Sequence, residues 1–431
     1  MFIRPFRTRS LNDFKIEIFW LIFSAMFFLT HSEIKANEWS NWLGPNHDGS
    51  IDNMDVTIPT SGKEYIVRWK KNIGIGWSSP IIDKNAVYLH DRKDGKEYIA
   101  SFDLNTGDER WSFSYLSEYR DSFGMSDGPR STPALSSGIM VSHGPQGLVH
   151  AVALNDGELI WVRDLKKDFS SPKGFFGRCS SPLIFEDKVI LDVGGPSCGL
   201  VALSLKSGKT LWVSEPHGND YSSPVPFLNN QEPLGLAFMR DGFLAVSLKT
   251  GQKSYFSPFR SPIDSSVNAA SPLVLGNKVF IYSCYEVGAG LWEYKKGSDG
   301  EHKMFHQLWR KNDVLDCHYS TPVSHGDYLF GFHGRQERSP VLRCVRLKDA
   351  EVQWSKDSMG AGNLIRVANK IFTITEKGEL VIFSAKFSKF DILYSQQFLG
   401  TGVKSHFAIA GGVLVARDNR RLICLDLNSF D

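Results

Sequence analysis

The sequence predicts an all-β fold: a single eight-bladed β-propeller of four-stranded antiparallel blades. A strand–turn–strand motif that closes on an aromatic residue recurs along the chain, and a Ser-Pro or Thr-Pro pair precedes most copies. The closing ring and the strand before it each occur eight times. The repeat takes up roughly 45 residues, which is the length of a propeller blade. With 42% hydrophobic and 22% charged residues, the composition is that of a globular protein and excludes disorder.

The strand–turn–strand motif is clearest in residues 99–111 (IASFDLNTGDERW), 150–161 and 201–212. Apolar and polar residues alternate on both sides of the turn, which is the two-residue period of a β-strand. The glycine of the turn supplies the positive φ that a tight hairpin needs. The eight predicted closing rings are Trp69, Trp111, Trp161, Trp212, Phe256, Trp309, Trp354 and Tyr394.

The second marker is a hydroxyl residue followed by proline, and a short apolar β run follows each pair. Proline at the first position of a strand removes no hydrogen bond that the sheet needs. Near Leu364 and Phe407 the same two-strand unit appears without proline, so each repeat contains four strands. The pairs are Ser79-Pro80, Thr132-Pro133, Ser181-Pro182, Ser223-Pro224, Ser271-Pro272 and Thr321-Pro322.

The two ends of the repeat region complement each other. Residues 66–72 read as a closing strand with no blade of their own, and residues 422–428 read as a third strand with no closing partner. We expect the first to pair with the second, which closes the ring and removes the exposed sheet edge. One position of the third strand is small in most repeats, and we expect this gap to receive a ring from a neighbouring sheet. The small residues are Ser101, Ala151, Ala202, Ala245, Cys344 and Cys424.

Residues 1–36 read as a secretory signal peptide, with a basic leader, an apolar run at 18–29 and a small residue, Ala36, at the cleavage position. The alternative is that this segment is kept as an uncleaved anchor. The remaining divisions are an N-terminal extension at 37–63 and the propeller at 64–431. We expect a periplasmic or secreted monomer with no transmembrane span in the mature chain. The formal net charge of only +2 argues against a nucleic-acid partner.

The six cysteines do not predict a metal site or a disulfide scaffold, because their spacing matches no zinc motif. The sequence leaves open whether a disulfide forms among Cys179, Cys198, Cys284 and Cys317. The twelve histidines are scattered over different repeats, and His302 and His306 lie in a segment that does not read as a helix. No cysteine precedes Cys179, so we expect no lipid-modified N-terminal cysteine.

The repeat resembles a known family. The pattern xDxxTGxxxW followed by Ser-Pro, together with the opening stretches at 39–49 and 74–80, is similar to the pyrroloquinoline quinone (PQQ) type of β-propeller in secreted PQQ-like repeat proteins. Its better-understood relatives are the quinone-dependent alcohol and sugar dehydrogenases and the propeller lipoprotein of the outer-membrane barrel-assembly machinery. The resemblance covers roughly residues 39–431, and it predicts the fold rather than one function.

The dehydrogenase resemblance implies a specific cofactor site. In those enzymes PQQ lies between a tryptophan and a vicinal disulfide, beside a Ca²⁺ ion with carboxylate and amide ligands, and an aspartate acts as base. The sequence contains no Cys-Cys dipeptide and lacks the insertions that carry the other parts. PQQ with Ca²⁺ is therefore expected only under the alternative function below, and otherwise no cofactor or metal is predicted.

Candidate ligand-binding residues come just before the innermost strand of each blade, at the mouth of the central channel. Concave mouths with convergent polar groups are common ligand sites, although such side chains can also simply cap strands and solvate a funnel. Two longer loops, 112–130 and 169–177, can flank this mouth. The candidates are Trp77, Arg130, Arg178, Tyr221, Asn268, His318, Tyr319, Asn363 and His406.

These observations predict a non-catalytic extracytoplasmic binding or scaffold protein with a protein or small-molecule partner in the cell envelope. No catalytic residue is predicted, and the expected partner is an envelope protein or peptide. The alternative is a PQQ-dependent oxidoreductase, an alcohol or sugar dehydrogenase, that uses the channel mouth. A bound-quinone spectrum together with dye reduction distinguishes the two.

Overall fold

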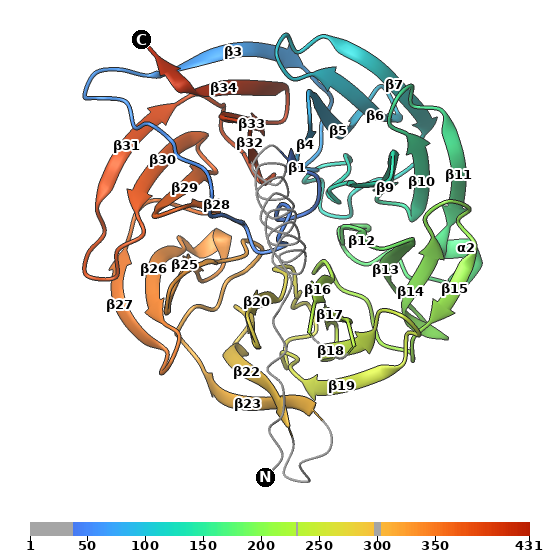
Figure 1. Cartoon of the computed structure of the whole chain (residues 1–431). Coiled ribbons are helices and arrows are strands. Elements are labelled where there is room, and N and C mark those ends of the chain that lie inside the picture. The colour runs from blue at the N-terminus through green and yellow to red at the C-terminus, as the bar shows by residue number, and fades with distance from the viewer. Residues whose placement is uncertain (1–37, 230–231, 297–302) are drawn as a thin grey trace, which may run out of the picture.

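The computed structural model describes residues 38–229, 232–296 and 303–431, which form eight sheets arranged in a closed ring (Figure 1). The predicted eight-bladed propeller is confirmed. The predicted signal peptide, residues 1–36, lies outside the described residues. No helix in the described ranges is long and apolar enough to cross a membrane.

The strands follow the chain blade by blade, from the channel outward. The first four blades are β4 (Ile81–Asp83), β5 (Ala86–Lys93), β6 (Lys96–Asp103) and β7 (Glu109–Leu116); β8 (Ala134–Ser136), β9 (Ile139–His143), β10 (Leu148–Ala153) and β11 (Leu159–Asp164); β12 (Leu183–Phe185), β13 (Lys188–Gly195), β14 (Cys198–Ser204) and β15 (Thr210–Val213); β16 (Val225–Phe227), β17 (Leu234–Met239), β18 (Gly242–Ser247) and β19 (Lys253–Pro258).

The last four blades repeat this order, and the eighth takes its outer strand from the N-terminal side. They are β20 (Leu273–Leu275), β21 (Lys278–Ser283), β22 (Gly288–Lys296) and β23 (Lys303–Lys311); β24 (Val323–His325), β25 (Tyr328–His333), β26 (Val341–Arg346) and β27 (Glu351–Lys356); β28 (Gly362–Val367), β29 (Lys370–Thr375), β30 (Glu379–Ser384) and β31 (Ile392–Gln397); β32 (Ala408–Ala410), β33 (Val413–Arg417), β34 (Arg421–Phe430) and β3 (Tyr65–Asn72).

Closure of the ring is as predicted. Strand β3 pairs antiparallel with β34, and Trp69 lies opposite Cys424. The last blade is therefore built from both ends of the propeller region, so neither β3 nor β34 is left with an unpaired inner edge.

The small residue of the third strand makes room for the closing ring of its own blade. Ser101 lies directly opposite Trp111 in the β6–β7 register, and the Trp111 ring leans over it to within 6.0 Å of the Tyr88 ring on β5. The expectation that the gap receives a ring from a neighbouring sheet is therefore wrong. The register places the closing ring over its cross-strand partner, where a larger side chain would collide with it.

The closing tryptophans also join each blade to the next, because the indole N–H donates to a backbone carbonyl there. In the fourth blade the residue opposite Ala245 is Tyr255 and not the predicted Phe256, because the β-bulge here is the same as in the other blades and places Tyr255 where they have their closing tryptophan. The indole hydrogen bonds run from Trp69 to Leu104, Trp111 to Leu154, Trp161 to Leu205, Trp212 to Leu248, Trp309 to Leu347 and Trp354 to Lys386.

The hydroxyl residues before proline form a second set of links, close to the channel. In each link the backbone N–H of one blade donates to the side-chain oxygen of the next. This explains why the marker needs a hydroxyl group as well as a proline. The links are Ser79 to Thr132 (3.1 Å), Thr132 to Ser181 (2.9 Å), Ser181 to Ser223 (2.9 Å) and Ser271 to Thr321 (3.1 Å).

The N-terminal extension begins inside the ring and then crosses the seventh blade to the outer rim, where it leads into β3, as the blue segment in Figure 1 shows. Strand β1 (Glu38–Trp39) pairs with β4, and β2 (Ser50–Ile51) pairs in parallel with β28. Two blades therefore have five strands rather than the predicted four. Trp42 donates from Nε1 to Ser271 Oγ (2.9 Å), and Trp39 stacks on His406 with 6.2 Å between ring centroids.

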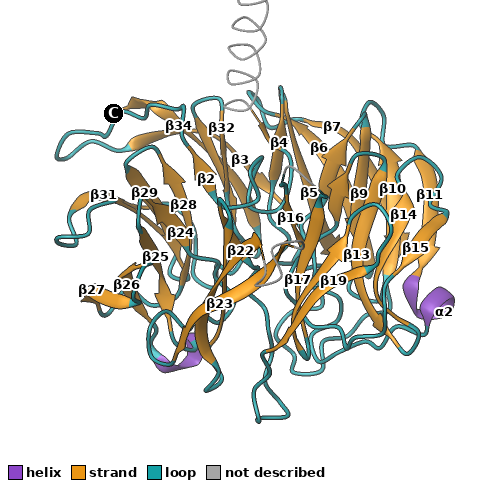
Figure 2. Ribbon diagram, turned by 60° about the horizontal axis from the view of Figure 1, so that its bottom comes forward, coloured by secondary structure: helices purple, strands orange, loops and turns teal. Residues whose placement is uncertain are grey.

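The loops that lead from the outer strand of one blade to the innermost strand of the next gather on one face of the ring. We call this the mouth face. The short helix α2 (Leu165–Phe169) belongs to one of these loops, and Figure 2 shows it on the side of the ring away from the C-terminus. The 3-10 turn η1 (Gln336–Arg338) connects β25 to β26.

Candidate functional site

The loop between β7 and β8, residues 117–133, is one of the two longest connections on the mouth face, the other being residues 165–182. The buried guanidinium of Arg92 holds its first part by donating to the carbonyls of Ser117 (2.7 Å), Tyr119 (2.6 Å) and Asp127 (2.8 Å). Three backbone acceptors around one cation fix the path of the loop, because each is a charge-assisted hydrogen bond away from solvent.

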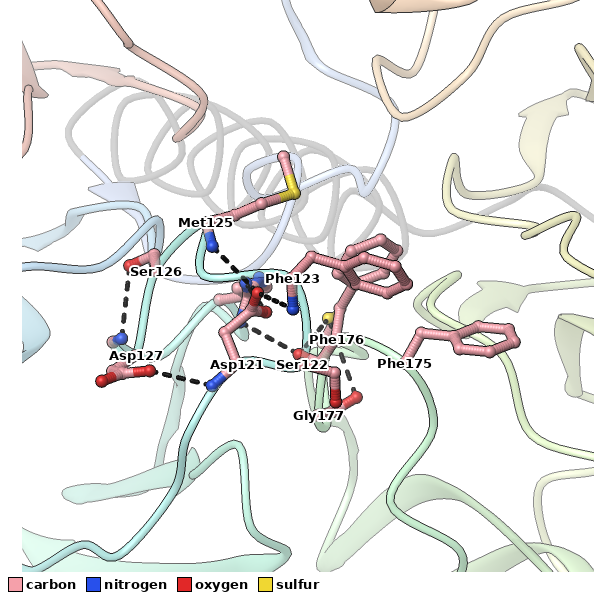
Figure 3. A network of polar contacts seen from close by, with 12 residues as sticks. Asp121, Ser122, Phe123, Met125, Ser126, Asp127, Phe175, Phe176 and Gly177 are labelled. Carbon is pink, nitrogen blue, oxygen red and sulfur yellow. Dashed lines mark hydrogen bonds and ion pairs between the residues drawn. The ribbon is translucent and has the colours of Figure 1, made fainter.

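Asp121 organises the tip of the same loop (Figure 3). One carboxylate oxygen accepts from the backbone N–H of Phe123 and of Met125, both at 2.9 Å, and the other pairs with Arg130 at 2.7 Å. Burial raises the pKa of Asp121, but the two backbone donors and Arg130 outweigh it and hold the pKa below its usual value. With the backbone tied to Asp121, the side chains of Phe123 and Met125 remain 62% and 42% exposed.

A second loop, between α2 and β12, brings another pair of rings to this place. The hydroxyl oxygen of Tyr221 accepts from the backbone N–H of Phe175 (2.6 Å) and of Phe176 (3.2 Å). The Phe176 ring lies between those of Phe123 (5.2 Å) and Tyr221 (5.6 Å). Phe175 points away from the loop in Figure 3 and is 44% exposed.

Cations and rings follow one another across the mouth face. The ammonium of Lys404 lies 4.8 Å from the centre of the Trp77 ring, and the guanidinium of Arg130 lies 4.6 Å from it. Arg130 is also 5.9 Å from the Phe176 ring and donates to the Phe176 carbonyl (3.0 Å). We call Trp77, Arg130, Phe176, Phe123 and Phe175 the aromatic track. Cation–π contacts join Trp77, Arg130 and Phe176, and ring–ring contacts join Phe176, Phe123 and Phe175.

Three of the sequence-predicted site residues, Trp77, Arg130 and Tyr221, therefore come together at the aromatic track. Arg178 is buried at the end of the loop that carries Phe175 and Phe176. Its guanidinium donates to Ser171 Oγ and to the Val193 carbonyl (3.3 Å), so it supports the second loop from within.

His318 and Tyr319 lie together in another part of the mouth. His318 Nε2 is 2.9 Å from the Tyr285 hydroxyl, and the Tyr319 hydroxyl donates to Glu376 (2.8 Å). Burial lowers the pKa of His318 to about 4, so the ring is neutral. The cavity beside these residues measures about 10 Å³, which is room for about one water molecule.

The other three predicted residues are buried and engaged in internal contacts. Asn268 donates to the carbonyl of Met239 (2.9 Å), and Asn363 donates to the carbonyls of Lys404 and Ser405 (both 3.2 Å). His406 packs on the N-terminal segment, and burial lowers its pKa to about 4. Asn363 is thus linked to the aromatic track through the loop that carries Lys404.

Sequence reasoning did not name Phe123, Met125, Lys173 or Lys404 as site residues. The unusual length and aromatic content of the first loop pointed to Phe123 and Met125. No sequence signal pointed to Lys404, because its place beside Trp77 depends on the closure of the eighth blade onto the first.

Larger hollows lie on the opposite face, between the turns of neighbouring blades. They measure about 840 and 520 Å³ and share Leu135, Ser136 and Ser137. Charged groups of both signs line them, including Asp83, Lys84 and Glu186, and no exposed ring projects into them. The mouth face, with its ordered and exposed aromatic residues, is the stronger candidate for recognition.

The residues at the mouth do not fit PQQ with Ca²⁺. A quinone needs free aromatic faces, but the Trp77 ring is already contacted by Arg130 and Lys404. All six cysteines are unpaired, so no disulfide supplies a second stacking face. Across the described ranges no group of three or more His, Cys, Asp or Glu side chains is placed to hold a metal ion.

Solved structures with the same fold have different roles. BamB from Moraxella catarrhalis superposes with a TM-score of 0.60 at 15% identity, over 85% of this chain and 98% of that one. The quinohemoprotein alcohol dehydrogenase from Comamonas testosteroni gives 0.65 at 10% identity, over 93% of this chain and 82% of that one. The computationally designed Ika8 protein gives 0.57 at 13% identity, over 84% and 100%. At these identities the similarity establishes the fold alone.

Comparison with curated protein sequences finds no match to this chain. The model of one protein family, described as outer membrane protein assembly factor BamB, matches residues 95–356. This stretch is well over half of the chain and runs from the first blade to the sixth. The chain therefore belongs to the BamB-like family of β-propellers.

Proposed function

We propose that the chain is a non-catalytic binding protein of the cell envelope, which acts as a monomer and holds a segment of a protein partner against the aromatic track. The observation that carries this proposal is the exposure of Phe123 and Phe175 on loops whose backbones are fixed by Asp121 and Tyr221. Exposed rings on ordered loops lose little conformational freedom when a partner covers them, and they are typical of binding surfaces.

The polar groups around the track also favour binding over catalysis. Asp121 is committed to Arg130 and to two backbone donors, and Tyr221 accepts two backbone hydrogen bonds. These side chains serve to hold the loops in place, which a recognition surface requires. Family membership supports an envelope role, and we propose a periplasmic or secreted protein released by cleavage near Ala36.

The experiment is co-purification with matched variants. The tagged full chain is expressed in the envelope of its source cells, crosslinked and purified, and bound proteins are quantified by mass spectrometry. We expect one partner that is enriched at least tenfold by the native chain, lost from the Phe123→Ser/Phe175→Ser double variant, and retained by Leu228→Ser. Leu228 is 68% exposed and lies outside the track, so it controls for the loss of an exposed apolar side chain.

Thermal unfolding of the purified variants checks that each one is folded. A partner bound equally by the double variant would contradict the proposal. Addition of PQQ and Ca²⁺ to the native chain tests the alternative directly. A bound-quinone spectrum with dye reduction by an alcohol or sugar would replace the binding function by an oxidoreductase.

A further inference from the structure

The charges beside the aromatic track point to the chemistry of the partner. We infer that the segment held there is an extended peptide with two large apolar side chains two residues apart, flanked by carboxylate side chains. This inference rests on the proposed function and adds the class of ligand to it.

The first observation is a pair of ammonium groups left without a carboxylate partner. Lys404 lies over Trp77, and Lys173 lies 5.0 Å from the ring of Tyr119 and donates to the Arg120 carbonyl (2.8 Å). Among the residues that the structure describes, neither ammonium forms an ion pair. A carboxylate of the partner would therefore be attracted by the ammonium groups of Lys173 and Lys404 without first displacing a carboxylate of this chain.

The second observation is that two of the three acidic groups of these loops, Asp121 and Asp127, are already engaged, whereas Glu118 is exposed. Asp121 is fully buried and paired with Arg130, whose side chain is 7% exposed. Asp127 pairs with Arg120 at 3.3 Å and accepts from the Asp121 backbone N–H. Loops 117–130, 170–178 and 398–407 together carry five basic residues (Arg120, Arg130, Lys173, Arg178 and Lys404) against three acidic ones (Glu118, Asp121 and Asp127), a formal excess of +2.

The third observation is the spacing of the rings. The centroids of Phe123 and Phe175 are 6.2 Å apart, and those of Phe123 and Phe176 are 5.2 Å apart. Alternate side chains on one face of an extended strand lie about 6.6 Å apart, at 3.3 Å per residue. The spacing of two alternate apolar side chains in an extended peptide is therefore close to the spacing of the rings in the aromatic track. The flexible thioether of Met125, on the same loop as Phe123, can pack against apolar side chains of different shapes.

The probe is a library of random 12-residue peptides displayed on phage, selected on the immobilised full chain and counter-selected on Phe123→Ser/Phe175→Ser. We expect enriched peptides to carry two residues from Phe, Trp, Leu, Ile and Met in an i, i+2 arrangement, with Asp or Glu on at least one side. Enrichment of Lys- or Arg-rich peptides, or no enrichment over the counter-selected variant, would overturn the inference.

The charge requirement is then tested with a synthetic copy of the most enriched peptide. Its Kd is expected to rise at least fivefold with Lys404→Gln and with Lys173→Gln/Lys404→Gln, and to rise with salt concentration. Lys249→Gln is the matched control, because Lys249 is an exposed lysine in a turn on the opposite face. An unchanged Kd in the lysine variants, or a Kd that does not respond to salt, would contradict the role of the two ammoniums.

The other occupants of this surface give different results. Sedimentation of the purified chain would show a dimer, abolished by Phe175→Ser, if a second copy covered the track. A partner that co-purifies through Phe123 and Phe175 while the library yields basic peptides would leave the proposed function standing and remove this inference. If no partner co-purifies through Phe123 and Phe175 and the library also yields no enriched peptide, the proposed function is contradicted as well.

Discussion

The indole ring of Trp69 lies directly against Gly107: a Cβ added to Gly107 would come within 2.6 Å of the ring. Trp69 closes the last blade, and Gly107 lies in the outer turn of the first blade, so this contact joins the two ends of the ring. The same contact recurs between Gly157 and Trp111 and between Gly208 and Trp161. The glycine of the repeat therefore has two tasks, a positive φ and a flat surface for the neighbouring indole.

The two tasks can be separated by comparing two substitutions. Gly107→Ala and Gly95→Ala each place a Cβ at a positive φ, +71° and +76°, but only at Gly107 does the new carbon meet a ring. We expect Gly95→Ala to lower the free energy of unfolding by about 1 kcal/mol through backbone strain alone. Gly107→Ala should cost at least about 2 kcal/mol more, since Trp69 must move. Urea unfolding measures both, and equal losses would argue against the packing role.

The N-terminal segment should be essential for stability, because it fills the channel. Trp39 is 1% exposed and packs on His406 and on Gly44. We expect Trp39→Ala to lower the free energy of unfolding by about 3–5 kcal/mol. Leu228→Ala, at an exposed apolar position, is the control and should cost less than about 0.5 kcal/mol. Denaturant unfolding measures the two variants, and similar small losses would show that the segment is dispensable.

The second blade carries two buried, neutral histidines, His143 on β9 and His150 on β10, which point to opposite faces of its sheet. His143 is buried with Nδ1 3.2 Å from the Ser180 carbonyl, and burial followed by the nearby Arg178 lowers its pKa to about 3. Burial lowers the pKa of His150 to about 4, and Glu97 opposes this shift. Both rings bind a proton more readily in the unfolded chain, where the pKa is near 6.5.

Stability should therefore fall as the pH drops from about 6.5 toward 4, since the unfolded state takes up protons that the folded state excludes. We expect His143→Gln to reduce the loss of unfolding free energy between pH 7 and pH 5 by roughly 2 kcal/mol. Burial raises the pKa of Asp220 to about 7, so Asp220 makes the free energy of unfolding increase as the pH falls. This contribution is the same in the native chain and in His143→Gln, so it cancels when the two are compared. An identical pH dependence for the variant and the native chain would contradict the assignment.

Asp121 should control the order of the aromatic loop. Asp121→Asn keeps the shape of the side chain but removes the charge that is paired with Arg130, so a buried cation loses its partner. We expect amide hydrogen exchange in residues 121–128 to rise at least tenfold. Asp156→Asn is the control, because Asp156 caps an exposed turn on the opposite face. Unchanged exchange in the loop after Asp121→Asn would show that another contact fixes it.

Much of the fold could be predicted because its links are local and repeated. The Ser/Thr-Pro marker and the Gly…Trp spacing recur because each blade makes the same hydrogen bonds to the next, as from Ser79 to Thr132. The position of the third-strand gap was found, but its occupant was misassigned, since the one-residue bulge before each closing ring is not visible in an alternation pattern.

The filling of the channel could not be predicted, because it depends on contacts that skip most of the chain. Trp42 reaches Ser271, 229 residues away, and β2 pairs with β28 from the seventh blade. The site was found only in part for the same reason. Trp77 and Arg130 follow from their place before an innermost strand, whereas Lys404 reaches Trp77 only when the ring closes.

The most direct test of the central claim is photo-crosslinking at one position of the aromatic track. p-Benzoylphenylalanine is incorporated in place of Phe175, and in a second sample in place of Leu228, in the full chain expressed in the cell envelope. We expect one light-dependent adduct with a single protein from position 175, weakened by Lys404→Gln, and none from position 228. No adduct from position 175, or the same adducts from both positions, would contradict it.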